Sequence, residues 1–152
     1  MLLNVKTKYG EVQGVPSPSA GVSMFCGVPY AKPPVGDLRW RAPREPDSWS
    51  GILKCDRFKA GAMQTKATMS FYVKEFPIDY SQITISEDCL YLNIWTPASS
   101  TSDRLPVMVY FHGGGDVTGF PHEPEHDGAR LAKKQVIYVC LLYTSDAADD
   151  RI

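Results

Sequence analysis

The sequence lacks any long apolar run and any block of like charges. No window approaches the roughly twenty apolar residues needed to cross a bilayer. The opening Met1-Leu-Leu-Asn-Val-Lys6 is too short and too soon polar for a signal peptide. Sixteen basic residues balance seventeen acidic ones, so neither nucleic acid nor an anionic membrane is indicated as a partner. We expect a globular chain without a membrane span. The missing signal peptide favours the cytoplasm but leaves the compartment, like the oligomeric state, undetermined.

The four cysteines form no recognisable site. Cys26, Cys55, Cys89 and Cys140 contain no CxxC pair and no cysteine–histidine cluster of the zinc type. Cys26 stands among apolar residues and is expected to be a small core side chain. The pattern therefore indicates no disulfide framework, no metal site and no cofactor.

What the sequence does contain is a strand followed by glycines. Val107–Phe111 has the length and composition of a buried strand, and His112 and three glycines, 113–115, follow it. Ordering three glycines costs backbone entropy, so a chain keeps them where a side chain would block the close approach of another group to the backbone. After a buried strand, the approaching group is usually a ligand atom, such as an oxyanion, which binds to backbone N–H groups. From these residues alone, a glycine-rich turn without a ligand is the alternative.

The other segments predict a β-rich first half and an α/β second half. A strand, a short helix and a further strand after residue 105 indicate a crossover between parallel neighbours. The first half is predicted to contain a hairpin at 5–14, a strand at 22–30 and an extended proline-rich loop at 31–49, anchored by Leu38, Trp40 and Trp49. A surface excursion with one short helix follows at 56–82. A strand at 90–95, covered on both faces, is joined by a polar turn to the strand at 105–111 as a β–turn–β unit, and a helix at 128–134 and a strand at 136–139 complete the prediction.

Three ordered segments resemble the type-B carboxylesterases, the family that includes the cholinesterases. Gly27-Val-Pro-Tyr-Ala-Lys-Pro-Pro-Val-Gly-Asp-Leu-Arg-Trp40 is similar to the family's early segment, and Glu87-Asp-Cys-Leu-Tyr-Leu-Asn-Ile-Trp-Thr-Pro97 to its most diagnostic signature. Residues 106–115 are similar to its oxyanion-hole segment. The resemblance implies an α/β-hydrolase fold, of class α/β. Residues 1–139 would be the N-terminal portion of that domain, a β-rich lead-in and the start of the central, mostly parallel sheet, and would be incomplete.

The resemblance also implies roles for particular residues. Gly114 and Gly115 would donate N–H groups to a substrate oxyanion, Gly113 would give the turn its room, and His112 would support the loop by hydrogen bonding. Each such donor stabilises the transition state by roughly 3 kcal/mol. Three residues are expected to be structural: Arg39 and Glu87 as an ion pair that ties the proline-rich loop to the signature strand, and Cys89 as the signature cysteine.

The sequence departs from the family pattern in three places. No cysteine stands near 62–64, where the usual disulfide partner of Cys89 lies, and Cys55 could replace it only if the backbone allowed. A free Cys89 is the simplest inference. No tryptophan occurs in 62–88, so choline specificity is not expected. Asp116 stands where the family has a bulky apolar residue, and nothing in the sequence explains it.

The residues that complete such a site are absent. The family's nucleophile, acid and histidine come in that order after the oxyanion segment, yet no G-x-S-x-G occurs and Ser145 has no flanking glycine. His122 and His126 precede any possible nucleophile and are not expected to be catalytic. Residues 140–152 have no counterpart in the family and resemble the translation of a sequencing adapter. We predict a non-native tail there, with a natural divergent C-terminus as the alternative.

Together these features predict part of a serine carboxylic-ester hydrolase that acts on a small-molecule ester and is inactive by itself. The alternative is a catalytically dead, cholinesterase-like adhesion or binding module. An intact His-Gly-Gly-Gly favours the enzyme, because a binding module has no reason to keep a cradle of donors.

Overall fold

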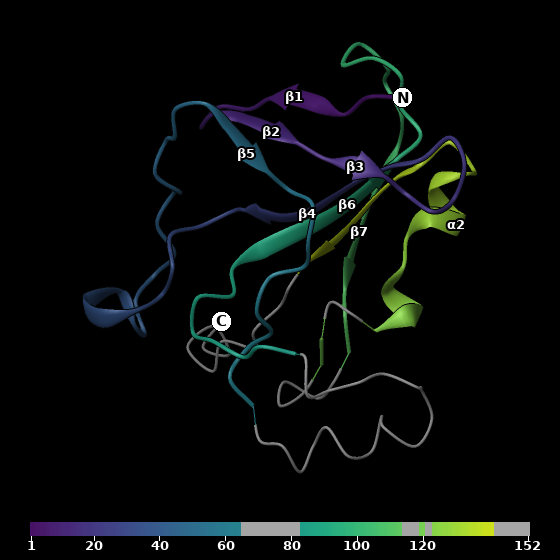
Figure 1. The fold of residues 1–152 in the computed structure, drawn as a ribbon. Coiled ribbons are helices and arrows are strands. Elements are labelled where there is room, and N and C mark those ends of the chain that lie inside the picture. The colour runs from purple at the N-terminus through teal and green to yellow at the C-terminus, as the bar shows by residue number, and fades with distance from the viewer. Residues whose placement is uncertain (65–82, 114–118, 121–122, 142–152) are drawn as a thin grey trace.

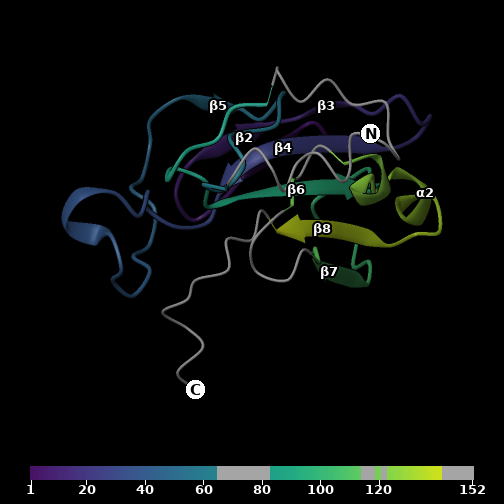
Figure 2. The ribbon, with the colours of Figure 1, turned by 90° about the horizontal axis from the view of Figure 1, so that it is seen from below.

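The computed structural model describes residues 1–64, 83–113, 119–120 and 123–141 (Figure 1). The strands form two sheets, a three-stranded one of order β1-β2-β5 and a five-stranded one of order β3-β4-β6-β8-β7. Figure 2 shows β4, β6, β8 and β7 side by side, with the short helix α2 beside them. Most of the predicted excursion at 56–82 lies outside the described residues.

The small sheet is built on the predicted N-terminal hairpin. Strands β1 (Asn4–Lys6) and β2 (Glu11–Gln13) pair antiparallel, and the Thr7 amide donates to the Gly10 carbonyl at 2.8 Å across the turn. The hairpin is therefore confirmed. Strand β5 (Ile52–Lys54) then adds to β2 in parallel register.

The large sheet contains the predicted strands in an order that the sequence does not show. Strands β3 (Val15–Pro16), β4 (Ser23–Pro29), β6 (Tyr91–Thr96) and β8 (Ile137–Leu141) pair antiparallel in turn. Strand β7 (Val107–Phe111) pairs in parallel with β8. The predicted crossover is thus confirmed, and among the described strands of this sheet the parallel part consists of that one pair. The two strands of the predicted β–turn–β unit are present, but they do not pair with each other, because β8 lies between β6 and β7.

The described residues of the crossover contain two short helical elements. The 3₁₀ turn η3 (Pro124–His126) leads into α2 (Ala129–Ala132), where the Asp127 carboxylate accepts a hydrogen bond from the Ala129 amide at 2.8 Å. That contact satisfies one of the free N–H groups at the start of the helix. Gly128 is required by packing, because a Cβ there would overlap the ring of Tyr138.

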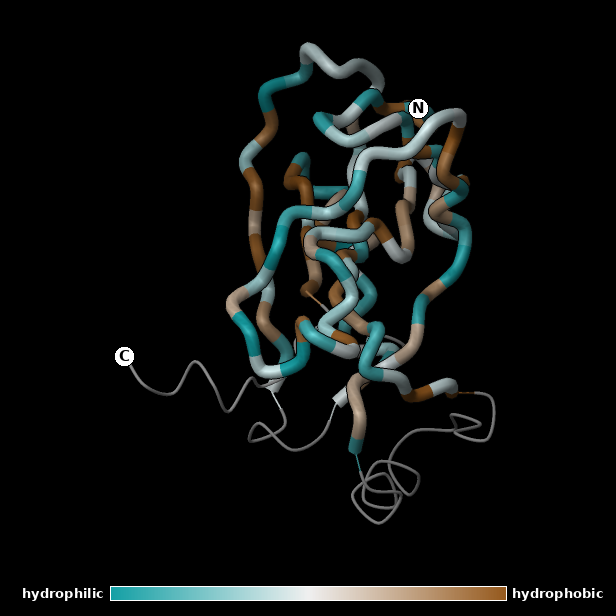
Figure 3. Tube along the Cα trace, turned by 90° about the vertical axis from the view of Figure 1, so that its left-hand side faces the viewer, coloured by the Kyte–Doolittle hydropathy of each residue, from teal (hydrophilic) through white to brown (hydrophobic). Residues whose placement is uncertain are grey.

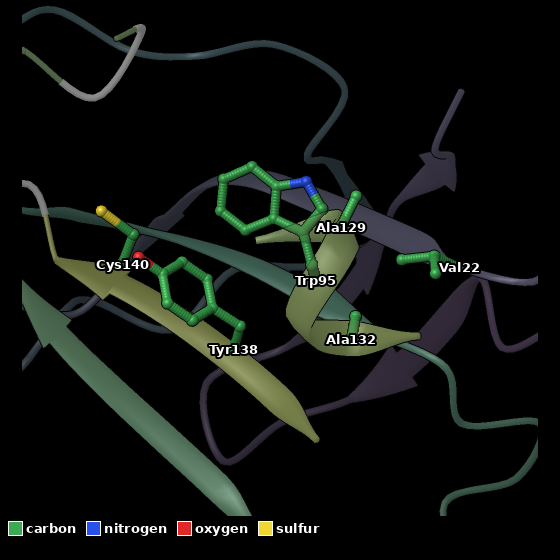
Figure 4. Packing of buried hydrophobic residues seen from close by; sticks show 6 residues of the cluster. All are labelled: Val22, Trp95, Ala129, Ala132, Tyr138 and Cys140. Atoms are coloured by element: carbon green, nitrogen blue, oxygen red, sulfur yellow. The ribbon is translucent and has the colours of Figure 1, made fainter. Parts of the chain in front are cut away.

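Strand β6 is covered on both faces, as predicted. Hydrophobic and hydrophilic residues are mixed along the trace (Figure 3). In β6, Ile94 and Trp95 are neighbours in the chain and therefore point to opposite faces of the sheet. Trp95 packs with Tyr138 and α2 (Figure 4). Ile94 packs against a second cluster that contains Phe25 and Cys55. The sheet therefore separates two apolar clusters, and a polar residue in β6 needs a partner.

Asn93 is that polar residue. It is almost fully buried, and its amide oxygen accepts a hydrogen bond from the Gly27 amide at 3.0 Å. Gly27 lies at the irregularity in the pairing between Cys26 and Val28, where the ladder is interrupted. The side chain thus satisfies a donor that the bulge frees.

The proline-rich loop contains the 3₁₀ turn η1 (Gly36–Leu38), and a further turn follows it at Arg39 and Trp40. Of its predicted anchors, Trp49 packs on the second cluster and its indole N–H donates to the Glu11 carbonyl at 2.9 Å. Trp40 is 68% exposed, so that part of the prediction is wrong. In a loop, no periodic pattern shows which side chains face the core. The apolar character of a side chain therefore does not show whether it is buried as an anchor or exposed.

Strand β7 has the apolar composition of a buried strand, yet each of its residues is exposed, from 37% at Tyr110 to 61% at Phe111. The prediction of burial is wrong for the described structure. The backbone hydrogen-bonding groups on one edge of β7 pair with β8, and no described strand pairs with its other edge. Within the described ranges, no helix is long and apolar enough to cross a membrane.

We predict that the 152-residue chain self-associates through β7, because an open apolar edge is a template for pairing with another copy. A lysine at the middle of the strand, Val109→Lys, should shift the chain towards monomer in sedimentation velocity over a concentration series. Val35→Lys makes the same change on an exposed loop residue and should not. Equal behaviour of the two variants would rule out β7 as the contact.

We also predict a loss of stability in alkali. Burial raises the pKa of the Cys26, Cys55 and Cys140 thiols from 9.0 to about 12, 11 and 12. Below pH 9 both states keep these protons, whereas above it the unfolded thiols ionise and the folded ones do not. Stability should therefore fall above about pH 9, measured as the urea midpoint over a pH series. Cys26→Ala should flatten the fall, and an unchanged slope would contradict the assignment.

Candidate active site

The candidate site begins where β7 ends. His112 and Gly113 follow Phe111 directly, and Phe111 lies opposite Leu141 in the parallel pair of β7 and β8. In open α/β sheets, ligands bind outside the carboxyl ends of parallel strands. The chain therefore delivers this turn to the edge of the sheet where such a site is built.

His112 is 8% exposed, and its ring is held at two sides by backbone. The ring Nδ1 lies 2.8 Å from the Gly113 carbonyl oxygen, which can only accept, so Nδ1 carries the hydrogen. Gly119 closes another side: a Cβ on it would lie 2.5 Å from the ring, and its φ of +134° disfavours a side chain as well. By contrast, a Cβ on Gly113 would meet no described atom within 4 Å.

A buried acid and base lie beneath this turn. Glu123 and His126, at the two ends of η3, are 4% and 3% exposed, and Oε2 of the first lies 3.5 Å from Nε2 of the second. The His126 Nδ1 lies 2.9 Å from the Phe120 carbonyl oxygen. The His126 ring stands 5.5 Å from the ring of His112 and 5.5 Å from that of Tyr110, between ring centroids.

Gln64 connects a distant loop to the same place. Its side-chain amide donates to the Gly119 carbonyl at 2.9 Å, and its carbonyl oxygen accepts from the Gly119 amide at 3.3 Å. Phe120, the next residue, is fully buried against Gly61. Gln64 thus holds the backbone that packs on the His112 ring.

With this geometry in place, the chain can be compared with known proteins. The family model described as "Carboxylesterase family" matches residues 2–144. The chain belongs to the carboxylesterase family. It is 40% identical over 140 residues to the para-nitrobenzyl esterase of Bacillus subtilis (strain 168), covering 91% of this chain and 27% of that protein. It is 39% identical over 142 residues to the cocaine esterase of Homo sapiens, covering 90% and 25%.

The crystal structure of a Geobacillus stearothermophilus carboxylesterase matches with a TM-score of 0.78 and 34% identity over 95% of this chain and 27% of that one. The described fold therefore corresponds to the N-terminal part of a carboxylesterase α/β-hydrolase. The chain spans about a quarter of the length of these relatives. The family match runs to residue 144, and Cys140 and Leu141 form the end of β8. The non-native origin of 140–152 stays a prediction.

The ion pair that the resemblance implies is present in this chain. Arg39 Nε lies 2.6 Å from Glu87 Oε1, which links the proline-rich loop to the signature segment. Both side chains are substantially exposed, and exposed pairs contribute about 0–1 kcal/mol. The pair is therefore suited to orienting the loop and adds little to overall stability.

The loop that lacks the usual disulfide cysteine is held by hydrogen bonds. The Gly61 amide donates to the Thr84 carbonyl and the Ser86 amide to the Gly61 carbonyl, both at 2.9 Å. The Cys89 thiol is buried and lies 3.2 Å from the Glu87 carbonyl oxygen. Cys55 is a free thiol in the second cluster, so it does not substitute for the missing partner.

Other predicted positions lie outside the described residues: Gly114, Gly115, Asp116, His122 and Ser145. Their predicted roles stay predictions. Sequence reasoning missed Gln64 and Glu123, which have no motif of their own and come from loops without periodicity. In the sequence, they could have been noticed only as polar side chains, able to form hydrogen bonds, in segments without a regular pattern. No group of three or more histidine, cysteine or acidic side chains in the described ranges could hold a metal ion.

We predict that Gly119→Ala displaces the His112 ring. The added Cβ would clash with ring atoms at 2.5 Å, so the thermal midpoint should fall and the His112 ring resonances should move. Gly21→Ala is the matched control, because Gly21 also has positive φ, +79°, but a Cβ on it would meet nothing within 4 Å. Equal effects of the two substitutions would mean that backbone strain, and not the ring contact, matters at Gly119.

Proposed function

We propose that this chain carries the oxyanion-hole segment of a serine carboxylic-ester hydrolase. The observation that supports this most is the position of His112 and Gly113 at the carboxyl end of β7, beside the parallel strand β8. A His-Gly-Gly-Gly turn after an early strand is where lipases and esterases of this fold build the hole. No described atom would lie within 4 Å of a Cβ on Gly113, which agrees with a ligand at that point.

In the proposed reaction, a serine oxygen attacks the ester carbonyl and its proton passes to a histidine base. The carbonyl oxygen becomes negatively charged in the tetrahedral intermediate. Gly114 and Gly115 would donate their N–H groups to that oxygen, and the residue after the nucleophile would supply a further donor. Donors placed in advance lower the barrier because they need no reorganisation as charge develops.

The local fold suits His112 for a supporting role in this reaction. Its Nδ1–H contact to the Gly113 carbonyl restrains the peptide group with which the glycine segment begins. Because a peptide group is planar, fixing its carbonyl also fixes the direction of the N–H that it contains. His112 would thereby orient a donor without touching the substrate, while Arg39 and Glu87 would orient the preceding loop.

The nucleophile, the acid and the base are not assigned to any residue of this chain, so the chain alone is proposed to be inactive. The substrate class is a small carboxylic ester, since the relatives bear the names of esterases. An adhesion or binding module without catalysis is the alternative. The residue at the nucleophile elbow of the full-length gene decides between them: a serine supports the hydrolase, and a substituted serine removes it.

We predict that the purified 152-residue chain does not hydrolyse p-nitrophenyl acetate above the uncatalysed rate. A chimera in which residues 2–141 replace the matching segment of the B. subtilis esterase should be active. Gly114→Pro removes an N–H donor and should lower kcat of the chimera by about 10²–10³, with unchanged circular dichroism as the folding control. Turnover by the chain alone that Gly114→Pro abolishes would contradict the proposed inactivity. A folded, active chimera that tolerates Gly114→Pro would contradict the oxyanion role.

A further inference from the structure

The described residues contain a buried acid–base pair that the ester-hydrolysis proposal does not use. Glu123 and His126 lie one 3₁₀ turn apart, both nearly inaccessible to water, with Oε2 and Nε2 3.5 Å apart. Burial of ionisable side chains is costly unless their charges are paired or neutralised. The two groups therefore need a defined proton arrangement.

The contacts of His126 restrict that arrangement. Its Nδ1 faces the Phe120 carbonyl oxygen at 2.9 Å, and a carbonyl can only accept, so Nδ1 carries a hydrogen. A neutral ring would then present a bare Nε2 to the Glu123 carboxyl group. A bare nitrogen and an ionised carboxylate are both acceptors and would repel. One further proton on the pair, either on Nε2 or on the carboxyl oxygen, removes the conflict and makes the pair neutral overall.

The pair is linked to the glycine turn through aromatic rings. Five rings, hereafter the ring column, run from the core to the turn: Trp95, Tyr138, Tyr110, His126 and His112. Successive centroids are 5.9, 5.9, 5.5 and 5.5 Å apart. His126 is the member that contacts both β7 and the His112 ring. Because Gly119 confines the ring of His112 as well, a displaced His126 would alter where Nδ1 of His112 meets the Gly113 carbonyl.

Other titratable groups also face the pair. Tyr110 comes from β7, and its ring stacks on that of Tyr138 from β8. Cys140, also on β8, has a pKa raised to about 12, first by burial and then by the charge of Glu123. Burial also raises the pKa of Tyr138. Phenols and thiols keep their protons near neutral pH, so among the described groups that face the pair a pH response comes from Glu123 and His126.

We propose that Glu123 and His126 share one buried proton and are positioning residues that hold the His112 ring at the start of the glycine segment. The catalytic meaning of this role depends on the proposed oxyanion function, whereas the coupling between the three side chains does not. Loss of the shared proton leaves two acceptors face to face, moves His126, and transmits the movement to His112.

The test is ¹⁵N NMR of the histidine rings over a pH series, on the 152-residue chain carrying Val109→Lys to limit association. The ring nitrogens report which of them carry protons. We expect His126 to show a protonated Nδ1, and the His112 ring signals to show a second, indirect shift at the pH where the pair loses its proton. In Glu123→Gln that second shift should be lost at that pH, because the neutral amide cannot carry the proton itself and no longer stabilises one on Nε2, so His126 stays neutral. The Gln N–H should still donate to Nε2 and keep the His112 signals at neutral pH.

Glu123→Met keeps the length of the side chain but removes the polar contact, so it should shift the His112 ring signals even at neutral pH. Glu45→Gln and Glu45→Met are the controls, since Glu45 is an exposed partner of Lys8. A second His112 shift that persists in Glu123→Gln would overturn the proposal, and this holds even if the Met variant does not fold. So would a folded Met variant with unchanged His112 signals, or a His126 without a proton on Nδ1.

The NMR test and the hydrolysis test fail separately. No ester is present in the NMR experiment, so loss of the coupling there leaves the oxyanion proposal standing. A chimera that tolerates Gly114→Pro would remove the oxyanion role but would not change the ring signals of the chain.

Discussion

The pairing of β8 on both of its edges is the interaction on which the rest of the described structure depends. Antiparallel hydrogen bonds join it to β6, and parallel ones join it to β7. The strand brings Tyr138 against Trp95 in the core and against Tyr110 on β7. Without β8, the signature strand β6 and the strand that leads to the glycine turn would have no common support.

The ring column connects β8 to the candidate site through a series of packed rings. Each aromatic pair contributes roughly 0.5–1.5 kcal/mol beyond the area that it buries. The more important effect is geometric, because each ring restricts the position of the next. The ring of His112 lies at the end of the series and contacts the Gly113 carbonyl. A turn rich in glycine has little stiffness of its own, so its geometry depends on what packs beneath it.

Local sequence patterns predicted most elements because their causes are local. Alternation of side chains identified β6, the glycine turn identified the β1–β2 hairpin, and the strand–helix–strand order identified the parallel pair of β7 and β8. The failures have non-local causes. Composition could not show that β8 lies between β6 and β7, or that β7 would be exposed, because both depend on which other strands are available to pair and cover.

The sequence by itself determined the family, the position of the His-Gly-Gly-Gly segment after a strand, and the absence of a nucleophile elbow, since these depend only on the order of residues. The Arg39–Glu87 pair also followed from that resemblance. Only the tertiary structure brought Glu123, His126 and Gln64 around His112. The burial of these side chains and their distances to His112 depend on how separate loops and strands pack together, and side-chain identity alone does not specify that packing.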